Sequence, residues 1–142
     1  MKKIFIGIAM LASFSAYAGP ISQKVINKFN EVFPGAQSVK WYDGDSYYGV
    51  SFKEGGMLHR VYYDRQGNVF RTIRYYDGAK LCPFIIMKLK EEYGNKTIKG
   101  VTEVQENSGL TYQVVLEDQK HMLVVNCNEE GDMSLQKKYK KV

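Results

Sequence analysis

The sequence predicts an α+β protein made of a tandem repeat, in which each unit is one helix followed by a four-stranded antiparallel meander. When the chain is shifted by 64 positions, Tyr48, Val50 and Phe52 fall on residues of matching character in the segment 112–116, without a gap. In each half the apolar spacing also changes from three or four residues to strict alternation. We therefore expect roughly eight strands in one sheet, with both helices covering one face.

The first residues indicate export. Lys2 and Lys3 precede an apolar run over residues 4–14, and Ala16-Tyr17-Ala18 then supplies the small residues of a signal-peptidase site. The run is much shorter than the roughly 20 residues that span a bilayer. We predict a signal peptide over residues 1–18, cleavage after Ala18, and a periplasmic or secreted mature protein without a membrane segment.

The first repeat is expected over residues 19–78. Ile21, Val25 and Phe29 recur at helical spacing with polar residues between them, and Pro34-Gly35 ends this helix. Alternating segments separated by glycine-bearing turns then predict strands. These strands are expected around residues 39–41, 48–52, 57–63 and 69–75.

The second repeat is expected over residues 79–142, and the two repeats together would form one compact domain. Pro83 suits the first turn of a helix, whose apolar stripe runs from Phe84 or Ile85 through Leu89 to Tyr93, and Gly94 ends it. Four further strands follow. They are expected over residues 98–105, 110–116, 120–127 and 132–139.

Alternation along the strands assigns each side chain to one face of the sheet. One set would point to the helices: Tyr48, Val50, Phe52, Val61, Tyr63 and Val69. The other set would lie on the helix-free face and is rich in Tyr, Phe and Arg, the residue types enriched at interface centres. Its candidates for partner binding are Tyr42, Tyr47, Lys53, Arg60, Tyr62, Phe70 and Arg74, with Tyr76 added by the same alternation. Alternatively, these tyrosines only stabilise cross-strand pairs.

Three motifs carry a resemblance to a known family. They are Phe33-Pro34-Gly35-Ala36-x-x-Val39-x-Trp41, Tyr48-x-Val50-x-Phe52 and Val61-x-Tyr63-Asp64-x-x-Gly67. Together they resemble the PepSY-like exported bacterial proteins, which are similar in fold to beta-lactamase inhibitor proteins. The resemblance covers essentially the whole mature chain. It implies tandem helix-plus-four-strand units, a periplasmic or extracellular setting and no enzymatic activity.

The chain offers little catalytic chemistry. Its two cysteines, Cys82 and Cys127, could form a disulfide in an oxidising compartment or remain separate thiols. A nucleophile pair of either cysteine with His59 or His121 is the strongest enzymatic interpretation, but nothing assembles such a pair. No HxxxH or CxxC spacing indicates a metal site. We expect no enzyme, no metal and no cofactor.

Charge excludes little else. The formal net charge is +5, and it becomes smaller when Lys2 and Lys3 are removed with the signal peptide. The one dense basic run lies at residues 137–141. This does not indicate nucleic-acid binding. The aromatic open face predicts a protein or peptide partner, and the resemblance to beta-lactamase inhibitor proteins implies that this partner is a hydrolase or peptidase. The alternative is a structural or small-ligand-binding envelope protein, with a glycan or metabolite as ligand.

Overall fold

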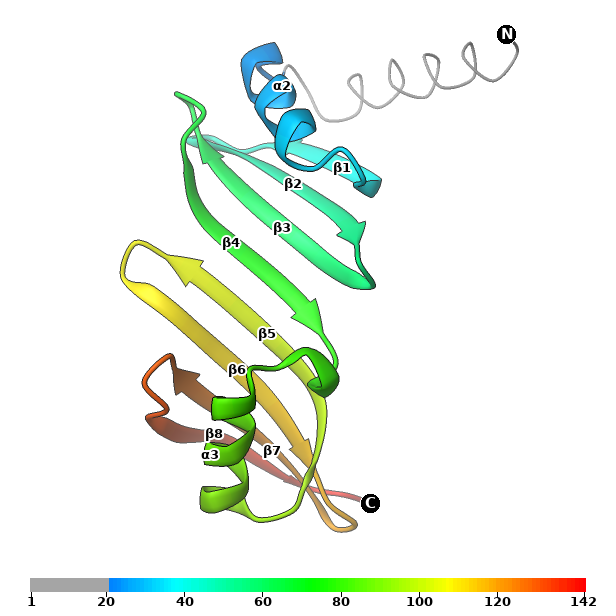
Figure 1. Ribbon diagram of the computed structural model, residues 1–142, viewed down its shortest axis with the longest axis vertical. Coiled ribbons are helices and arrows are strands. Elements are labelled where there is room, and N and C mark those ends of the chain that lie inside the picture. The colour runs from blue at the N-terminus through cyan, green and yellow to red at the C-terminus, as the bar shows by residue number, and fades with distance from the viewer. Residues whose placement is uncertain (1–20) are drawn as a thin grey trace, which may run out of the picture. The chain divides into compact units, whose positions relative to one another are not determined.

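The computed structural model describes residues 21–142, so the predicted signal peptide lies outside the described residues. A helix followed by four strands occurs twice along the chain (Figure 1). The elements are α2 (Gln23–Val32), β1 (Gln37–Asp43), β2 (Tyr47–Glu54), β3 (Met57–Asp64), β4 (Val69–Tyr76), the short 3-10 helix η1 (Gly78–Lys80), α3 (Pro83–Tyr93), β5 (Thr97–Glu106), β6 (Gly109–Glu117), β7 (His121–Asn128) and β8 (Met133–Lys140).

The eight strands belong to one sheet whose order follows the chain from β1 to β8. The pairs β1–β2, β2–β3, β5–β6, β6–β7 and β7–β8 are antiparallel. The predicted α+β class with an antiparallel sheet is confirmed. The chain divides into two compact units, one ending at Thr72 and the other running from Ile73 to Val142.

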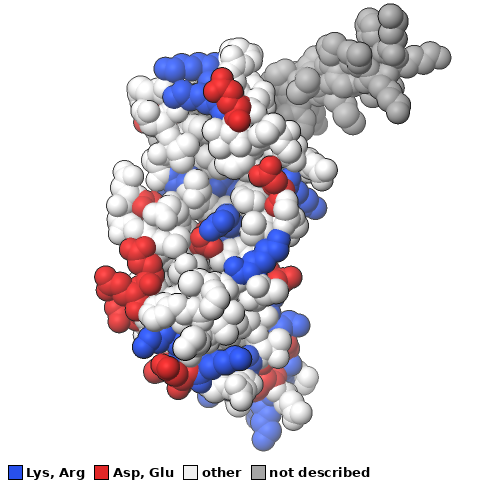
Figure 2. All heavy atoms as spheres, viewed as in Figure 1, with Lys and Arg blue, Asp and Glu red and all other residues white. Residues whose placement is uncertain are grey.

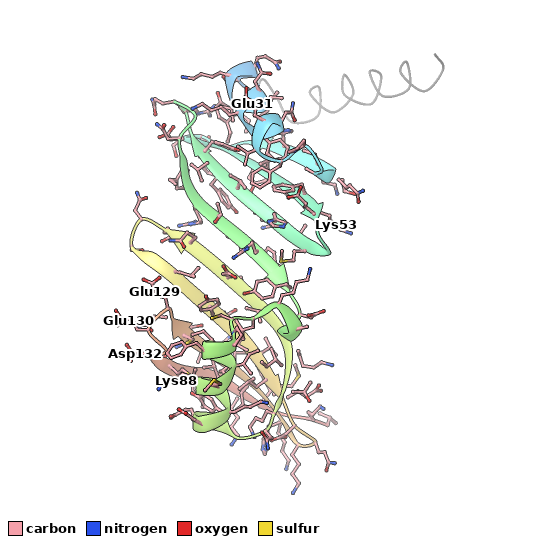
Figure 3. All side chains as sticks on the ribbon, in the orientation of Figure 1. Glu31, Lys53, Lys88, Glu129, Glu130 and Asp132 are labelled. Carbon is pink, nitrogen blue, oxygen red and sulfur yellow. The ribbon has the colours of Figure 1, made fainter. Side chains whose placement is uncertain are left out.

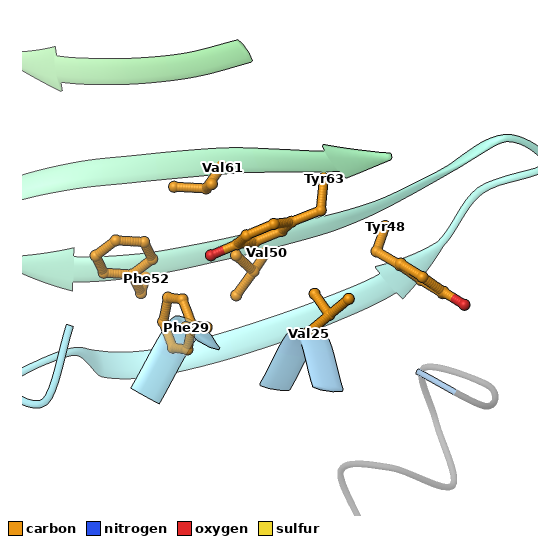
Figure 4. Packing of buried hydrophobic residues seen from close by; sticks show 7 residues of the cluster. All are labelled: Val25, Phe29, Tyr48, Val50, Phe52, Val61 and Tyr63. Atoms are coloured by element: carbon orange, nitrogen blue, oxygen red, sulfur yellow. The ribbon is translucent and has the colours of Figure 1, made fainter. Parts of the chain in front are cut away.

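The core of the first unit lies between α2 and the strands β1 to β3. Val25 and Phe29 are the buried residues of α2, and they lie over Val50, Phe52 and other buried strand residues (Figure 4). The Phe29 ring meets the Phe52 ring edge-on, with centroids 5.0 Å apart. Such pairs add to the hydrophobic gain from burial. This packing fixes which face of the first unit is left for other contacts.

Side-chain hydrogen bonds fix the β3–β4 hairpin. Asp64 accepts hydrogen bonds from the backbone and the side chain of Asn68, at 2.8 Å and 3.1 Å. These bonds hold the pKa of Asp64 below its usual value. Gly67 has φ 91°, which favours glycine. The turn after β7 is built in the same way from Asn128, Asp132 and Gly131, whose φ is also 91°.

The second unit buries one face of β5 to β7 under α3, whose Ile85 and Leu89 are buried, whereas β8 has no buried residue. Phe84 is 45% exposed, so Ile85 is the residue that begins the apolar stripe. The buried strand residues alternate along each strand. They are Val101, Glu103, Tyr112, Val114, Leu116, Leu123, Val125 and Cys127.

Two expected directions in β4 are wrong. Val69 was expected to point to the helix, but it is 50% exposed and the cluster under α2 includes no residue of β4. Tyr76 was expected on the open face but is 8% exposed, and its hydroxyl donates a hydrogen bond to the buried carboxylate of Glu103. Strict alternation therefore does not predict the burial of the first and last residues of β4. Val69 at its start lies outside the cluster under α2, whereas Tyr76 at its end contacts Glu103 of the second unit.

Neither of the two α-helices in residues 21–142 combines the length and the hydrophobicity that a bilayer crossing requires.

Candidate functional site

Four aromatic rings meet on the first unit, on the face of the strands away from α2. We call Tyr42, Tyr47, Tyr62 and Phe70 the aromatic cluster. The centroid of the Tyr62 ring lies 6.3 Å from that of Tyr42, 5.7 Å from that of Tyr47 and 6.1 Å from that of Phe70. All four side chains are half-buried. They bring together rings from β1, β2, β3 and β4, and each ring keeps accessible surface.

Strand register explains why these rings touch. Tyr42 of β1 pairs with Gly49 of β2, and Gly49 pairs with Tyr62 of β3. A Cβ atom at Gly49 would lie only 2.1 Å from ring atoms of Tyr42. The missing side chain therefore lets the Tyr42 ring lie across β2 and reach Tyr62. Sequence reasoning missed Gly49, although a glycine inside an alternating strand often marks a close approach.

Two cations lie beside the cluster. The guanidinium carbon of Arg71 is 5.8 Å from the centroid of Tyr62, within cation–π range. Burial and a hydrogen bond with Tyr62 raise the pKa of Tyr42 well above its usual value, and the charge of Arg60 opposes this rise. Tyr42 is therefore a neutral phenol at physiological pH. The site combines uncharged aromatic surface with positive charge at its margin.

Lys53 and Arg74, the other two predicted site residues, lie outside the cluster. Lys53 is exposed at the far end of β2 from Tyr47 (Figure 3). Arg74 belongs to the second unit, where its guanidinium forms an ion pair with Glu103. The structure thus brings together Tyr42, Tyr47, Arg60, Tyr62 and Phe70 of the seven predicted residues.

Arg65 holds the frame at one end of the cluster, and sequence reasoning gave it no role. Its Nη1 lies 2.7 Å from Asp43 Oδ1, its Nη2 donates to the carbonyl of Asp45 at 3.2 Å, and its guanidinium lies 4.4 Å over the Tyr48 ring. Arg65 therefore ties the turn after β1 to the turn after β3. The only sequence feature that indicates this role is the position of Arg65 in a hairpin turn, where a cationic side chain is usually just solvated.

The two cysteines are free thiols in this structure. Cys82 is exposed at the position preceding α3, and Cys127 is buried on β7 with its Sγ donating to the Asn128 carbonyl at 3.2 Å. Burial raises the pKa of the Cys127 thiol, and the charge of Asp132 adds to this. Both effects lower its thiolate fraction and its reactivity.

We expect a thiol reagent to label the two cysteines in different ways. In the unreduced native protein, Cys82 should react quickly and Cys127 slowly, and mass spectrometry after unfolding should show two labels. A Cys82→Ser variant should lose only the fast phase. Two unlabelled cysteines in the unfolded, unreduced protein would instead demonstrate a disulfide.

The contacts of the histidines are with residues other than cysteine. The His59 ring stacks on Phe52 with centroids 4.9 Å apart, and its Nε2 lies 3.3 Å from the Glu54 carbonyl. His121 Nδ1 lies 3.8 Å from Asp118 Oδ1. Within residues 21–142, no three side chains of His, Cys, Asp or Glu gather as a metal site requires.

The fold defines a class of α+β proteins with an antiparallel sheet. A BLIP-like protein from Bacteroides fragilis shares this fold with a TM-score of 0.64 and 21% identity, over 86% of this chain and 87% of that chain. A DUF2874 family protein from Bacteroides ovatus has a TM-score of 0.63 and 19% identity, over 87% and 89% of the two chains. A candidate periplasmic protein from Bacteroides eggerthii has a TM-score of 0.63 and 14% identity, over 86% and 90%.

These similarities confirm the predicted resemblance to BLIP-like proteins at the level of fold. No family model and no curated protein matches the chain.

Proposed function

We propose that this chain is an exported, non-enzymatic binding protein that uses its aromatic cluster to dock a protein partner and restrain a hydrolase or peptidase. The observation that carries the proposal is the meeting of four accessible rings beside two arginines on one strand face. Aromatic residues and arginine supply most of the energy of protein interfaces. Cross-strand stabilisation alone requires neither the glycine that accommodates Tyr42 nor the flanking cations.

We also propose that the two units arose from a duplicated module. At an offset of 64 positions, six buried residues of the first unit correspond to buried residues of the second. The buried pairs are Val25 with Leu89, Tyr48 with Tyr112, Val50 with Val114, Phe52 with Leu116, Val61 with Val125 and Tyr63 with Cys127. The turn glycines Gly67 and Gly131 share a φ of 91°. Within this proposal, the aromatic cluster is a specialisation of the first copy.

The export setting is part of the proposal and rests on the sequence of residues 1–18. The candidate periplasmic protein of the same fold supports it. The inhibitory role is supported by the BLIP-like neighbour, whose chain has the same fold. A standard interface needs roughly 800 Å² on each partner, which exposed parts of four strands can supply.

A capture experiment tests the docking surface. Immobilised mature protein should retain a specific hydrolase or peptidase from periplasmic extract, and should lower the activity of that enzyme. The double variant Arg60→Ala plus Tyr62→Ala should lose at least about tenfold in affinity, since hot-spot truncations cost about 2 kcal/mol or more. Equal recovery and equal inhibition by the variant would contradict the proposal.

Two further variants sharpen this test. Gly49→Ala removes no ring but forces Tyr42 off β2, so it should also weaken capture. The matched control is Gln113→Ala plus Asn126→Ala, which changes exposed polar residues of the second unit. The control should bind the partner as the wild type does.

A further inference from the structure

The second unit carries a hollow of about 440 Å³ over β5 to β8. This volume falls in the range of about 300–1,000 Å³ that is typical of small-ligand sites. Most of its lining residues are uncharged and polar, and they include Thr102, Thr111, Gln113, Asn126, Asn128 and Ser134. Val104, Tyr112, Cys127 and Asp132 complete the lining. Along their strands, Thr102, Gln113 and Asn126 alternate with the buried residues Glu103, Tyr112 and Cys127, so their side chains point away from the core that α3 covers.

Register aligns four of these residues in a row. Thr102 pairs with Gln113, Gln113 with Asn126, and Asn126 with Ser134, each on the next strand. Neighbouring strands lie about 4.8 Å apart, so hydroxyl, amide, amide and hydroxyl groups repeat at this spacing. Gln113, Asn126 and Ser134 are exposed. The row is therefore accessible to a ligand that crosses the strands.

The amides of this row retain hydrogen-bonding capacity. Gln113 Nε2 donates to Asn126 Oδ1 at 3.3 Å. This bond orients both side chains and leaves Gln113 Oε1 as an acceptor and Asn126 Nδ2 as a donor. The Asn128 amide, in contrast, is occupied in the β7–β8 turn, where it contacts Asp132 and accepts from the backbone of Glu130. The row, rather than the turn, supplies the groups for a ligand.

The lining of the hollow itself offers no positive charge to an anionic ligand. No Lys or Arg belongs to the described residues that line the hollow, and Asp132 is its one carboxylate. Figure 3 places Glu129, Glu130 and Asp132 together at the adjacent turn, where Figure 2 shows a patch of acidic side chains. Negative charge at this edge repels phosphate, sulfate and uronate groups.

An apolar strip runs beside the polar row on the same face. Val115 pairs with Val124, and each lies two residues along its strand from Gln113 or Asn126. Both valines are half-buried. Gly100, which pairs with Val115, leaves open space where another residue would place a Cβ. A ligand with one hydroxyl-bearing edge and one C–H face would fit this combination.

We propose that this hollow binds a short, uncharged oligosaccharide lying across β5 to β8. Sugar hydroxyls would bond to the row formed by Thr102, Gln113, Asn126 and Ser134. The C–H face of the rings would contact Val115 and Val124, which lie beside the hollow on the same face. An extended peptide fits less well, because its same-side groups recur at roughly 6.8 Å. This site is independent of the aromatic cluster and does not rest on the proposed docking of a protein.

Titration calorimetry with defined probes tests the proposal. The probes are neutral hexasaccharides of glucose or of N-acetylglucosamine, an oligogalacturonate of equal length, and an uncharged extended hexapeptide. At least one neutral hexasaccharide should bind, and the oligogalacturonate and the peptide should bind at least about tenfold more weakly. A failure of all neutral probes to bind at millimolar concentration would overturn the proposal, as would a preference for the acidic probe or the peptide.

Variants locate the binding. Gln113→Ala plus Asn126→Ala should weaken the oligosaccharide at least about tenfold, because two hydrogen-bonding amides are lost. Thr102→Val plus Ser134→Ala should also weaken it, and thermal unfolding should show that both variants are folded. Arg60→Ala plus Tyr62→Ala is the matched control and should bind the sugar normally. Unchanged affinity in both hollow variants would place the sugar elsewhere and contradict the assignment.

Discussion

Replacing Phe52 by alanine is expected to lower the free energy of unfolding by about 3–5 kcal/mol, the usual cost of truncating a buried phenylalanine. Phe52 is 0% exposed and its ring contacts three others. The partner rings are those of Phe29, Phe33 and His59. The first unit has few residues under α2, so a cavity there removes a large share of its core. Urea unfolding followed by circular dichroism measures the loss.

Val69→Ala is the matched control for this experiment. Alternation placed Val69 on the same face as Phe52, but Val69 is 50% exposed. Its truncation should cost less than about 1 kcal/mol, as is usual for surface positions. A loss at Val69 equal to that at Phe52, or a Phe52→Ala protein as stable as the wild type, would contradict the packing of α2 on β2.

The second large effect is expected at Glu103, a charged residue that is only 7% exposed. It accepts a hydrogen bond from the Tyr76 hydroxyl and forms an ion pair with Arg74. Glu103→Ala should cost about 2–3 kcal/mol, chiefly because the buried Tyr76 hydroxyl loses its acceptor. Arg74 adds less, since 44% of its side chain is exposed and water can solvate it. Glu103→Gln keeps an acceptor and should cost less than Glu103→Ala.

A double-mutant cycle distinguishes the loss of the Tyr76–Glu103 hydrogen bond from the loss of side-chain volume at position 103. Tyr76→Phe removes the hydroxyl that would lose its acceptor. Glu103→Ala should therefore lower the free energy of unfolding by less in the Tyr76→Phe background than in the wild type. The coupling energy should exceed about 0.5 kcal/mol. Strictly additive losses would show that Glu103 and Tyr76 do not depend on each other.

Local patterns were sufficient for most of the fold. Pro34 and Pro83 helped to place the helices, while the glycine-bearing turns at Gly67 and Gly131 separated the strands. Proline and glycine act on the backbone close to their own positions, so their effects can be predicted from a single sequence. The residues buried in β2 and β3 followed from alternation, because one face there is covered by α2.

What the sequence did not reveal depends on contacts between distant residues. Tyr76 was expected on the open face because alternation was extended along β4, but Glu103 accepts its hydroxyl. A charged residue in an inward position of the alternating segment 98–105 was the available signal. Gly49 was missed for a similar reason, since its role depends on the Tyr42 ring of a neighbouring strand.

The sequence predicted the aromatic residues of the candidate site, but it also included residues that lie outside the aromatic cluster. Alternation placed Tyr42, Tyr47, Tyr62 and Phe70 in one predicted set, and their rings contact one another in the structure. It also collected Arg74, whose ion pair with Glu103 follows from a contact within the second unit that no local pattern encodes. The hollow over β5 to β8 was not foreseen, since its polar row exists only through strand register.

The central claim, that the aromatic cluster is a docking surface, is tested most directly by site-specific photo-crosslinking in living cells. A photoreactive amino acid would replace Tyr62 in the cluster and, in a separate variant, Lys24 on the exposed side of α2. The account predicts a discrete adduct with one exported hydrolase or peptidase from position 62 and none from position 24. Adducts from position 24 alone, or no adduct from position 62 in cells that contain the captured enzyme, would contradict it.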